Sequence, residues 1–305
     1  MKLIRPPRLH PGDRVGVVAA SGPVDREKFE AGVEALGGRY DLSIDEGALF
    51  ARTGFLAGED AHRLKALNAA IRDPDYRAIF LARGGYGLTR ILPDIDRVAL
   101  RAQPKPIVGY SDATALLSVC VHAGVATIHG PMISDFADLS DEDRISLFNL
   151  LENPDPGEIF TGLETLVGGT VQGSLLGGNL EVLTRLLGTP LQPDFQGALL
   201  FLEEVGELPY RVDRLLTHLE SAGVFNSVAG IVIGDFTDCD ELEEGVVQPP
   251  TTRDVLMERL GRLSVPVALG GPFGHGDHKG SLPYGVPVEL DADAGVLTAI
   301  EGAVS

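Results

Sequence analysis

The sequence of 305 residues has no tryptophan, only two cysteines and no long hydrophobic run. The cysteines, Cys120 and Cys239, form no C-x-x-C pair, so we expect two free thiols in a reducing cytoplasm rather than a disulfide framework. No apolar run approaches the ~20 residues that span a bilayer, and residues 1–7 lack the apolar core of a secretion signal. We therefore expect a cytoplasmic protein without a membrane partner.

Basic residues are also scarce. Lys and Arg number 25 against 44 Asp and Glu, which gives a net charge of -19. This field repels nucleic acid and anionic lipid surfaces, and no basic cluster offsets it, so a nucleic-acid partner is not expected. The length, with 44% hydrophobic residues, allows about two domains with ordinary cores.

Short apolar runs alternate with helical patterns in the first half of the chain. Strands are predicted over 14–20, 78–82, 106–109 and 125–128, and helices over 25–36, 59–71, 112–123 and 140–152. This alternation predicts an α/β fold with a parallel, Rossmann-like (flavodoxin-like) sheet, and ligands at the carboxyl ends of its strands.

Prolines and glycines between 153 and 168 mark a linker. We therefore predict an N-terminal α/β domain over 1–160 and a C-terminal domain of mixed β and α structure over 161–305. The second half is predicted to contain helices over 180–187, 210–222 and 252–263, strands over 198–205 and 229–234, and a hairpin over 286–300.

One corner of the first half has the pattern of a displayed nucleophile. The run Gly109-Tyr110-Ser111-Asp112-Ala113 joins a buried strand to a helix and is close to the G-x-S-x-G elbow, although Ala113 replaces the last glycine. The alternative is that Ser111 only caps the helix, because serine is a favoured N-cap. The stretch alone leaves both interpretations open.

A glycine-rich loop, with Gly84, Gly85 and Gly87, follows the preceding strand. Glycines let a backbone come close to a ligand and aim an N–H group at an oxyanion. A phosphate cradle is poorly supported, because no Lys-Ser/Thr follows and the G-x-G-x-x-G spacing is absent. A turn made only for close packing stays open.

The second half supplies candidate acids and bases. Glu203 follows four bulky apolar residues at the end of a predicted strand, although it could be a solvated acid. His275 lies in a glycine-rich loop that suits a positioned general base. His275, Asp277 and His278 fit no standard zinc spacing, so no metal is expected. His129 competes as the base.

The acidic segment 235–244 lacks the D-x-D-x-D-G order of a calcium loop and is predicted to be a solvated loop.

Five groups of motifs resemble the LD-carboxypeptidase family, whose best-known members are the muramoyltetrapeptide carboxypeptidases. They are Ala82-Arg83-Gly84-Gly85-Tyr86-Gly87, Gly109-Tyr110-Ser111-Asp112-Ala113-Thr114, His129-Gly130-Pro131-Met132, Phe201-Leu202-Glu203-Glu204 with Pro209-Tyr210-Arg211-Val212-Asp213-Arg214, and Gly274-His275 with Leu282-Pro283-Tyr284-Gly285. The resemblance runs in order over almost the whole chain.

The resemblance implies a serine peptidase with a triad split between two domains. Ser111 is then the nucleophile, His275 the base and Glu203 the acid that orients it, with Glu204 and Glu207 excluded from that role. Family members in the cytoplasm release the terminal D-alanine from tetrapeptide stems of recycled cell-wall fragments, as homodimers without metals or other cofactors. The segment 276–280 departs from the usual pattern, which leaves the stem specificity open.

The implied reaction is acyl transfer to water, with the amides of Asp112 and Gly85 holding the oxyanion. Arg83 is a candidate reader of the substrate's terminal carboxylate, or else it ties down its own loop. A microcin C immunity-type peptidase of the same family is an alternative. Such enzymes stack a base on aromatic residues of an inserted loop, whereas 135–170 offers only Phe136, Phe148 and Phe160. A non-catalytic module that binds a peptide or muropeptide also stays open.

Overall fold

The computed structural model describes residues 3–243, 246–247 and 249–305, and the chain forms two compact units. Unit 1 comprises Met1–Pro156, Gly280–Gly285 and Gly302–Ser305, and unit 2 comprises Gly157–Lys279 and Val286–Glu301. The chain thus returns twice to unit 1 after unit 2 has begun, a feature that the predicted contiguous domains 1–160 and 161–305 do not include.

Hydrogen bonds explain the return. Strand β14 (Leu282–Tyr284) pairs antiparallel with β5 (Thr127–His129). The Ser305 amide donates to the Pro6 carbonyl at 2.8 Å. A three-residue strand that contains proline gives almost no sequence signal, because proline removes a ladder donor and is confined to strand edges.

Unit 1 is built on a six-stranded sheet with the order β14-β5-β4-β3-β1-β2. Its other strands are β1 (Arg14–Val18), β2 (Asp41–Ile44), β3 (Ala78–Leu81) and β4 (Ile107–Gly109). All pairs except β14 with β5 are parallel. The order 2-1-3-4-5 is that of flavodoxin-like folds, so the predicted fold class is confirmed, and the order reverses between β1 and β3.

Helices cover both faces of this sheet. They are α1 (Arg26–Leu36), α2 (Glu46–Leu49), α3 (Asp60–Arg72), α4 (Arg97–Ala102), α5 (Ala113–His122) and α6 (Asp141–Glu152), with 3₁₀ turns over Leu88–Arg90, Leu92–Asp94 and Ile133–Asp135. Capping hydrogen bonds confirm the predicted N-termini of two of these helices, α1 and α6. The Asp25 carboxylate accepts from the Lys28 amide, and the Ser140 hydroxyl accepts from the Asp143 amide.

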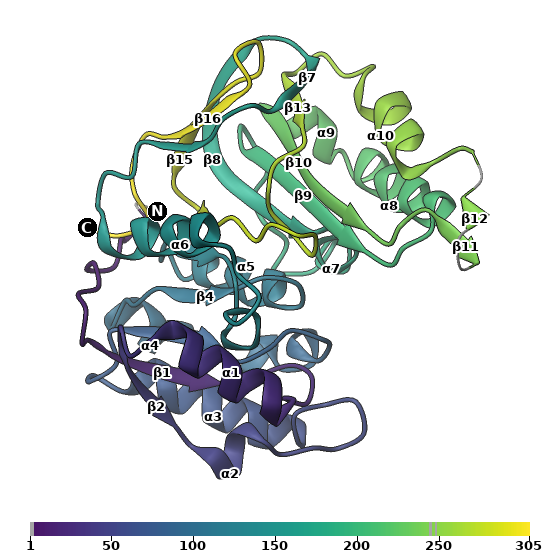
Figure 1. The fold of residues 1–305 in the computed structure, drawn as a ribbon. Coiled ribbons are helices and arrows are strands. Elements are labelled where there is room, and N and C mark those ends of the chain that lie inside the picture. Colours follow the sequence, from purple (N-terminus) through teal and green to yellow (C-terminus); the bar gives the residue numbers. More distant parts are fainter. Residues whose placement is uncertain (1–2, 244–245, 248) are drawn as a thin grey trace. The chain divides into compact units, whose positions relative to one another are not determined.

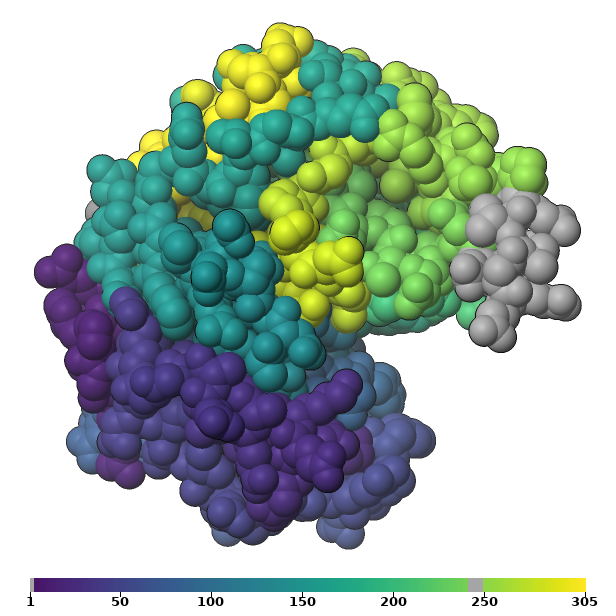
Figure 2. Space-filling view, in the orientation of Figure 1, coloured from purple at the N-terminus to yellow at the C-terminus, as the bar shows by residue number. Residues whose placement is uncertain are grey.

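Unit 2 is built on an eight-stranded mixed sheet with the order β6-β16-β15-β8-β9-β10-β13-β7. Its strands are β6 (Glu158–Phe160), β7 (Glu164–Val167), β8 (Thr170–Asn179), β9 (Leu199–Val205), β10 (Gly230–Thr237), β13 (Val267–Leu269), β15 (Pro287–Asp291) and β16 (Val296–Ala299). Strands β8, β9, β10 and β13 run parallel, and the others pair antiparallel. The yellow β15–β16 hairpin and the teal segment beside it are visible in Figure 2.

The helices of unit 2 pack on the sheet through apolar side chains. They are α7 (Leu180–Thr184), α8 (Pro209–Ser221), α9 (Val224–Ser227) and α10 (Thr252–Leu260), and α8 lies next to α10 (Figure 1). The predicted inward residues of α8, Val212, Leu215, Leu216 and Leu219, are all buried. They share a core with Leu200 and Leu202 of β9.

The predicted acidic loop over 235–244 is partly wrong. Asp235 belongs to β10, and residues Glu241–Glu243 form β11, which pairs with β12 (Val246–Val247). Glu244 lies outside the described residues.

Among the helices that the structure describes, none combines the length and the apolar character needed to cross a bilayer.

Candidate functional site

Ser111 lies at a sharp corner between β4 and α5 in unit 1. Its φ is 62°, an angle that few residues other than glycine adopt. The N-cap of α5 is Asp112, and no side chain caps this helix end, so the interpretation of Ser111 as a mere cap is wrong. A half-exposed serine held at positive φ between a strand and a helix has the geometry of a nucleophile elbow.

The glycine-rich loop lies directly against this serine. A Cβ at Gly84 would lie 3.0 Å from the Ser111 Cβ and 3.1 Å from its Oγ. The Gly22 amide donates to the Gly84 carbonyl at 3.0 Å, which joins the loops after β1 and β3. Within the described part of the chain, the amides of Gly85 and Asp112 donate to no acceptor. Close packing therefore explains Gly84, and two amides beside the corner stay available to an oxyanion.

Gly84→Ala should lower kcat/KM by about tenfold or more, because the added methyl crowds the hydroxyl that has to reach a substrate carbonyl. The backbone at Gly84 is not at positive φ, so little strain is added. Gly47→Ala, on an exposed turn of α2 with no close contact to backbone, is the matched control. Steady-state kinetics and thermal melts of both variants measure the effect, and an unchanged kcat/KM in Gly84→Ala would contradict it.

Asp112 holds the loop in place through its side chain. Its buried carboxylate accepts from the Leu88 amide at 2.9 Å. Burial raises the pKa of Asp112, while the hydrogen bond from the Leu88 amide, the nearby Ser21 hydroxyl and the charge of Arg63 act in the opposite direction. The residue therefore links the serine corner to the end of the glycine-rich loop.

Arg63 is a supporting residue that the sequence analysis missed. Its side chain is fully buried, and it donates to the Ala20 carbonyl at 2.5 Å and to Asp60 at 2.5 Å. The spacing of Arg63, Leu67 and Ile71 on α3 carried the signal, because residues four apart share one face of a helix.

Arg83 makes a contact that fits the loop-tying alternative. Its Nη1 donates to the Pro23 carbonyl at 2.7 Å, and the residue is exposed.

Of the three predicted catalytic residues, the structure brings Glu203 and His275 together within unit 2 and places Ser111 in unit 1. His275 Nδ1 lies 2.7 Å from Glu203 Oε2. Glu203 is fully buried, whereas the imidazole retains 18% exposure. A buried carboxylate on Nδ1 favours the tautomer whose Nε2 accepts a proton, which is the tautomer that a general base needs.

The alternation of β9 explains why Glu203, rather than its neighbour, meets the histidine. Leu200 and Leu202 point into the core with α8, so Phe201 and Glu203 point to the opposite face. The ring of Phe201 contacts the ring of Phe273 there, with centroids 5.7 Å apart. Residue 273 begins the turn that carries His275, so packing on this face delivers the imidazole to Glu203.

Contacts with β10 fix the turn around His275. The Asp235 amide donates to the Phe273 carbonyl at 2.9 Å. Gly274 has a φ of 122°, and a Cβ there would lie 3.0 Å from the Glu203 Cβ, so the close approach requires glycine. Burial raises the pKa of Asp235, and nearby His278 opposes the shift.

Asp277 and His278 are exposed. In the ranges that the structure describes, no three His, Cys, Asp or Glu side chains gather as metal ligands.

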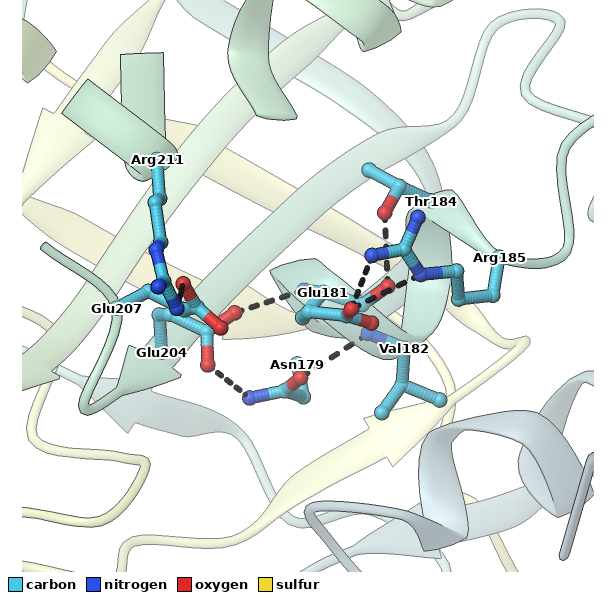
Figure 3. Close-up of polar contacts among 8 residues, drawn as sticks. All are labelled: Asn179, Glu181, Val182, Thr184, Arg185, Glu204, Glu207 and Arg211. Atoms are coloured by element: carbon cyan, nitrogen blue, oxygen red, sulfur yellow. Dashed lines mark hydrogen bonds and ion pairs between the residues drawn. The ribbon is translucent and has the colours of Figure 1, made fainter. Parts of the chain in front are cut away.

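Glu204 has a different environment on the helix face of β9 (Figure 3). Its buried carboxylate accepts from Asn179 Nδ2 at 2.9 Å and from the Glu181 amide at 2.7 Å. It also accepts from the Val205 amide at 2.8 Å. Burial raises the pKa of Glu204 to about 7, although these hydrogen bonds lower it. The residue thus joins β9 to the start of α7.

The raised pKa predicts a stability that depends on pH. Between pH 4.5, the ordinary pKa of the carboxyl, and pH 7, folded Glu204 retains a proton that the unfolded chain has released. The folded state is stabilised by this retained proton, and the stabilisation is complete below pH 4.5 and is lost as the pH rises through 7. The free energy of unfolding of the wild type, minus that of Glu204→Gln, should fall by about 1 to 3 kcal/mol over this window. Denaturant titrations of both proteins at several pH values measure this difference. If the two free energies of unfolding change with pH in parallel, the prediction is wrong.

His129, the competing base, lies on β5 and is 1% exposed. Its ring packs edge to face against Tyr110, with centroids 6.0 Å apart. Such burial suits a packing residue better than a base that meets a substrate.

Two family models match most of the chain. The LD-carboxypeptidase N-terminal domain matches residues 15–130, and the LD-carboxypeptidase C-terminal domain matches residues 172–290. These matches confirm the resemblance found in the motifs.

Individual proteins agree with the family models. The murein tetrapeptide carboxypeptidase of Pseudomonas aeruginosa is 31% identical over 92% of this chain and 94% of its own. The crystal structure of muramoyltetrapeptide carboxypeptidase from Oxalobacter formigenes has a TM-score of 0.82 and 31% identity, covering 95% of this chain and 98% of that one. The wild-type apo structure of the microcin C7 self-immunity protein MccF has a TM-score of 0.88 and 26% identity, covering 99% of this chain and 100% of that one.

Proposed function

The chain belongs to the LD-carboxypeptidase family of serine peptidases, and from this premise we propose that it releases the terminal D-alanine from muropeptide tetrapeptide stems during peptidoglycan recycling. The observation that carries the proposal is the hydrogen bond between buried Glu203 and His275. The positive φ of Ser111 adds to it, because a strained corner displays a nucleophile.

In the proposed reaction, Ser111 Oγ attacks the scissile carbonyl while His275 Nε2 takes its proton. The amides of Gly85 and Asp112 donate to the oxyanion of the tetrahedral intermediate. His275 then protonates the amine of D-alanine, which leaves. Water, deprotonated by His275, hydrolyses the acyl-enzyme and restores Ser111. Glu203 keeps Nδ1 protonated and stabilises the imidazolium in both halves of the cycle.

The alternative of a microcin C immunity-type peptidase has the structural similarity to MccF in its favour. The three aromatic residues that could stack a base do not suit it. Phe136 and Phe160 are buried, and Phe148 packs against the core of unit 1 beneath the Arg39 guanidinium. A cell-wall peptide is therefore the better-supported substrate.

The function is tested by incubating the protein with a synthetic muropeptide tetrapeptide and assaying free D-alanine, with a matched peptide that ends in L-alanine as the control. Release from the first peptide alone supports the proposal. Release of neither residue, together with no labelling of Ser111 by a serine-directed acylating probe, would instead favour a non-catalytic peptide-binding module.

A cytoplasmic location and a homodimer complete the proposal. Both cysteines are unpaired and buried, which suits a reducing compartment. Sedimentation equilibrium would test the dimer.

A further inference from the structure

Strand β10 contains one residue more than β9 beside Glu203. The pairs on either side of the extra residue are Ile233 with Leu202 and Phe236 with Glu204. Gly234 and Asp235 therefore both lie opposite Glu203. An extra residue of this kind bends a strand and changes the direction of its side chains, and it is over-represented beside active sites.

The extra residue turns Asp235 toward the face of the sheet that carries Glu203. In an unbroken strand the side chains alternate, so residue 235 would share the face of Ile233, which packs in the core with α8. Instead, a Cβ at Gly274 would lie 3.5 Å from the Asp235 Cβ and 3.1 Å from Glu203 Oε2. Phe236 then packs against the core again. Two carboxylates from neighbouring strands thus approach the same turn.

This turn carries His275 between two glycines, and each glycine contacts one of the two acidic side chains. Gly274 lies against Glu203, as described above. A Cβ at Gly276 would lie 2.7 Å from the Asp235 Cγ, which leaves no room for a side chain. The φ of Gly276 is not positive, so the close approach of Asp235, rather than the backbone conformation, requires glycine there.

The Asp235 carboxylate is half-buried, and within the described ranges it has neither a hydrogen-bond donor nor an ion-pair partner. The charged groups around it are Glu203 from β9 and Asp277, His278 and Lys279 from the turn. Burial raises the pKa of Asp235, the charges of His278 and Lys279 oppose this shift, and Glu203 adds to it. Lys279 Nζ donates to the Gly276 carbonyl at 3.0 Å instead. The negative charge of Asp235 is therefore not neutralised by direct contact.

A second carboxylate beside a general base has a defined effect. In the proposed reaction, the imidazolium of His275 forms against buried Glu203, whose Oε2 lies 2.7 Å from Nδ1. A further negative charge next to the same turn stabilises the imidazolium relative to the neutral ring. Salt screens such an interaction less in half-buried surroundings than between exposed groups.

We propose that Asp235 is a positioning residue for the general base. Its side chain holds the turn that carries His275 against Glu203, and its negative charge favours the protonated imidazole. The inference deepens the proposed carboxypeptidase function and rests on it for the catalytic consequence, whereas the effect of the charge on the imidazole can be measured without a substrate.

Asp235→Asn tests the charge, because the carboxamide has almost the size of the carboxylate and keeps the contact with Gly276. The acid limb of kcat/KM for a tetrapeptide, which reports protonation of the free base, should move toward lower pH by about 0.5 or more. A change that only loosens the turn would lower kcat/KM at every pH and leave the limb in place. Asp235→Ala also removes the contact and should lower kcat by a further tenfold or so.

Asp194→Asn is the matched control, because it removes the same charge from an exposed position before β9 and keeps an acceptor for the Gln196 amide. Its acid limb should coincide with that of the wild type.

Nuclear magnetic resonance separates this proposal from the carboxypeptidase function. The Cε1–H signal of His275, assigned by its loss in His275→Gln, gives the titration midpoint of the imidazole in the substrate-free protein. A lower midpoint in Asp235→Asn than in the wild type and Asp194→Asn supports the role of Asp235, even if no D-alanine is ever released. Equal midpoints in the three proteins would overturn that role, even if the tetrapeptide is hydrolysed.

Discussion

Replacing Ser111 with alanine is expected to lower kcat by about 10⁴-fold or more, equivalent to about 5.5 kcal/mol of transition-state stabilisation. The reason is that the hydroxyl oxygen forms the acyl bond, and no other side chain at this corner supplies a nucleophile. Folding should be retained, because serine and alanine both carry a Cβ and experience the same strain at a φ of 62°. Release of D-alanine under saturating tetrapeptide measures kcat.

The control is Ser43→Ala on β2, which removes a hydroxyl bonded to Tyr76 at 2.8 Å and should leave kcat within a few-fold of the wild type. If serine acts as the nucleophile with His275, the double variant Ser111→Ala/His275→Ala should be about as slow as either single variant. Turnover within tenfold of wild type in Ser111→Ala would remove this serine from the mechanism.

The fold of unit 1 could be predicted because its signals are local. Strands such as β3, Ala78–Leu81, are buried on both faces, so their apolar residues are consecutive and visible in the sequence. Helix ends were equally visible where a side chain or glycine caps them, as at Asp25 and Gly37.

Elements that depend on distant partners could not be predicted. Strand β2, Asp41–Ile44, lies at the sheet edge and is mostly half-buried or exposed, so it has no continuous apolar run. Strand β8, Thr170–Asn179, contains three glycines, and Gly177 is required because a Cβ there would lie 1.8 Å from the Phe201 carbonyl oxygen. When only its sequence neighbours are considered, a glycine that is required by close contact with a distant strand looks like part of a turn.

The candidate site likewise combines residues that could be predicted from the sequence with residues that could not. Glu203 and His275 could be proposed as a pair because a resemblance to a family supplied their roles, and the observed contact between them follows from the alternation of side chains along β9. The support of Asp112 and Arg63 for the serine corner could not be deduced, because it depends on which loops meet after the sheet has formed. Patterns along a chain show which residues are buried, and only the assembled sheet shows which of them touch.

Glu203→Gln is expected to reduce kcat by about 10³ to 10⁴-fold, since the orienting acid of a serine peptidase triad has an effect of this size. The carboxamide has two orientations in its fully buried position. If its NH₂ group faces His275 Nδ1, the ring must carry its proton on Nε2, which then cannot accept the serine proton. If its oxygen faces Nδ1, the NH₂ group occupies the site of Oε1, which has no hydrogen-bond partner among the described residues, and the imidazolium loses its counter-charge.

The adjacent Glu204→Gln is the matched control, because it makes the same substitution on the opposite face of β9, where the carboxylate contacts Asn179 and the start of α7 instead of a histidine. It should retain kcat within about tenfold at pH 7, since no reacting group depends on it for a proton. Comparable losses in the two variants would show that the strand end is sensitive to any change, and they would remove Glu203 from its assigned role. A loss confined to Glu203→Gln, with kcat/KM falling in parallel, would place the effect in the transition state, where the imidazolium forms and needs the carboxylate beside it.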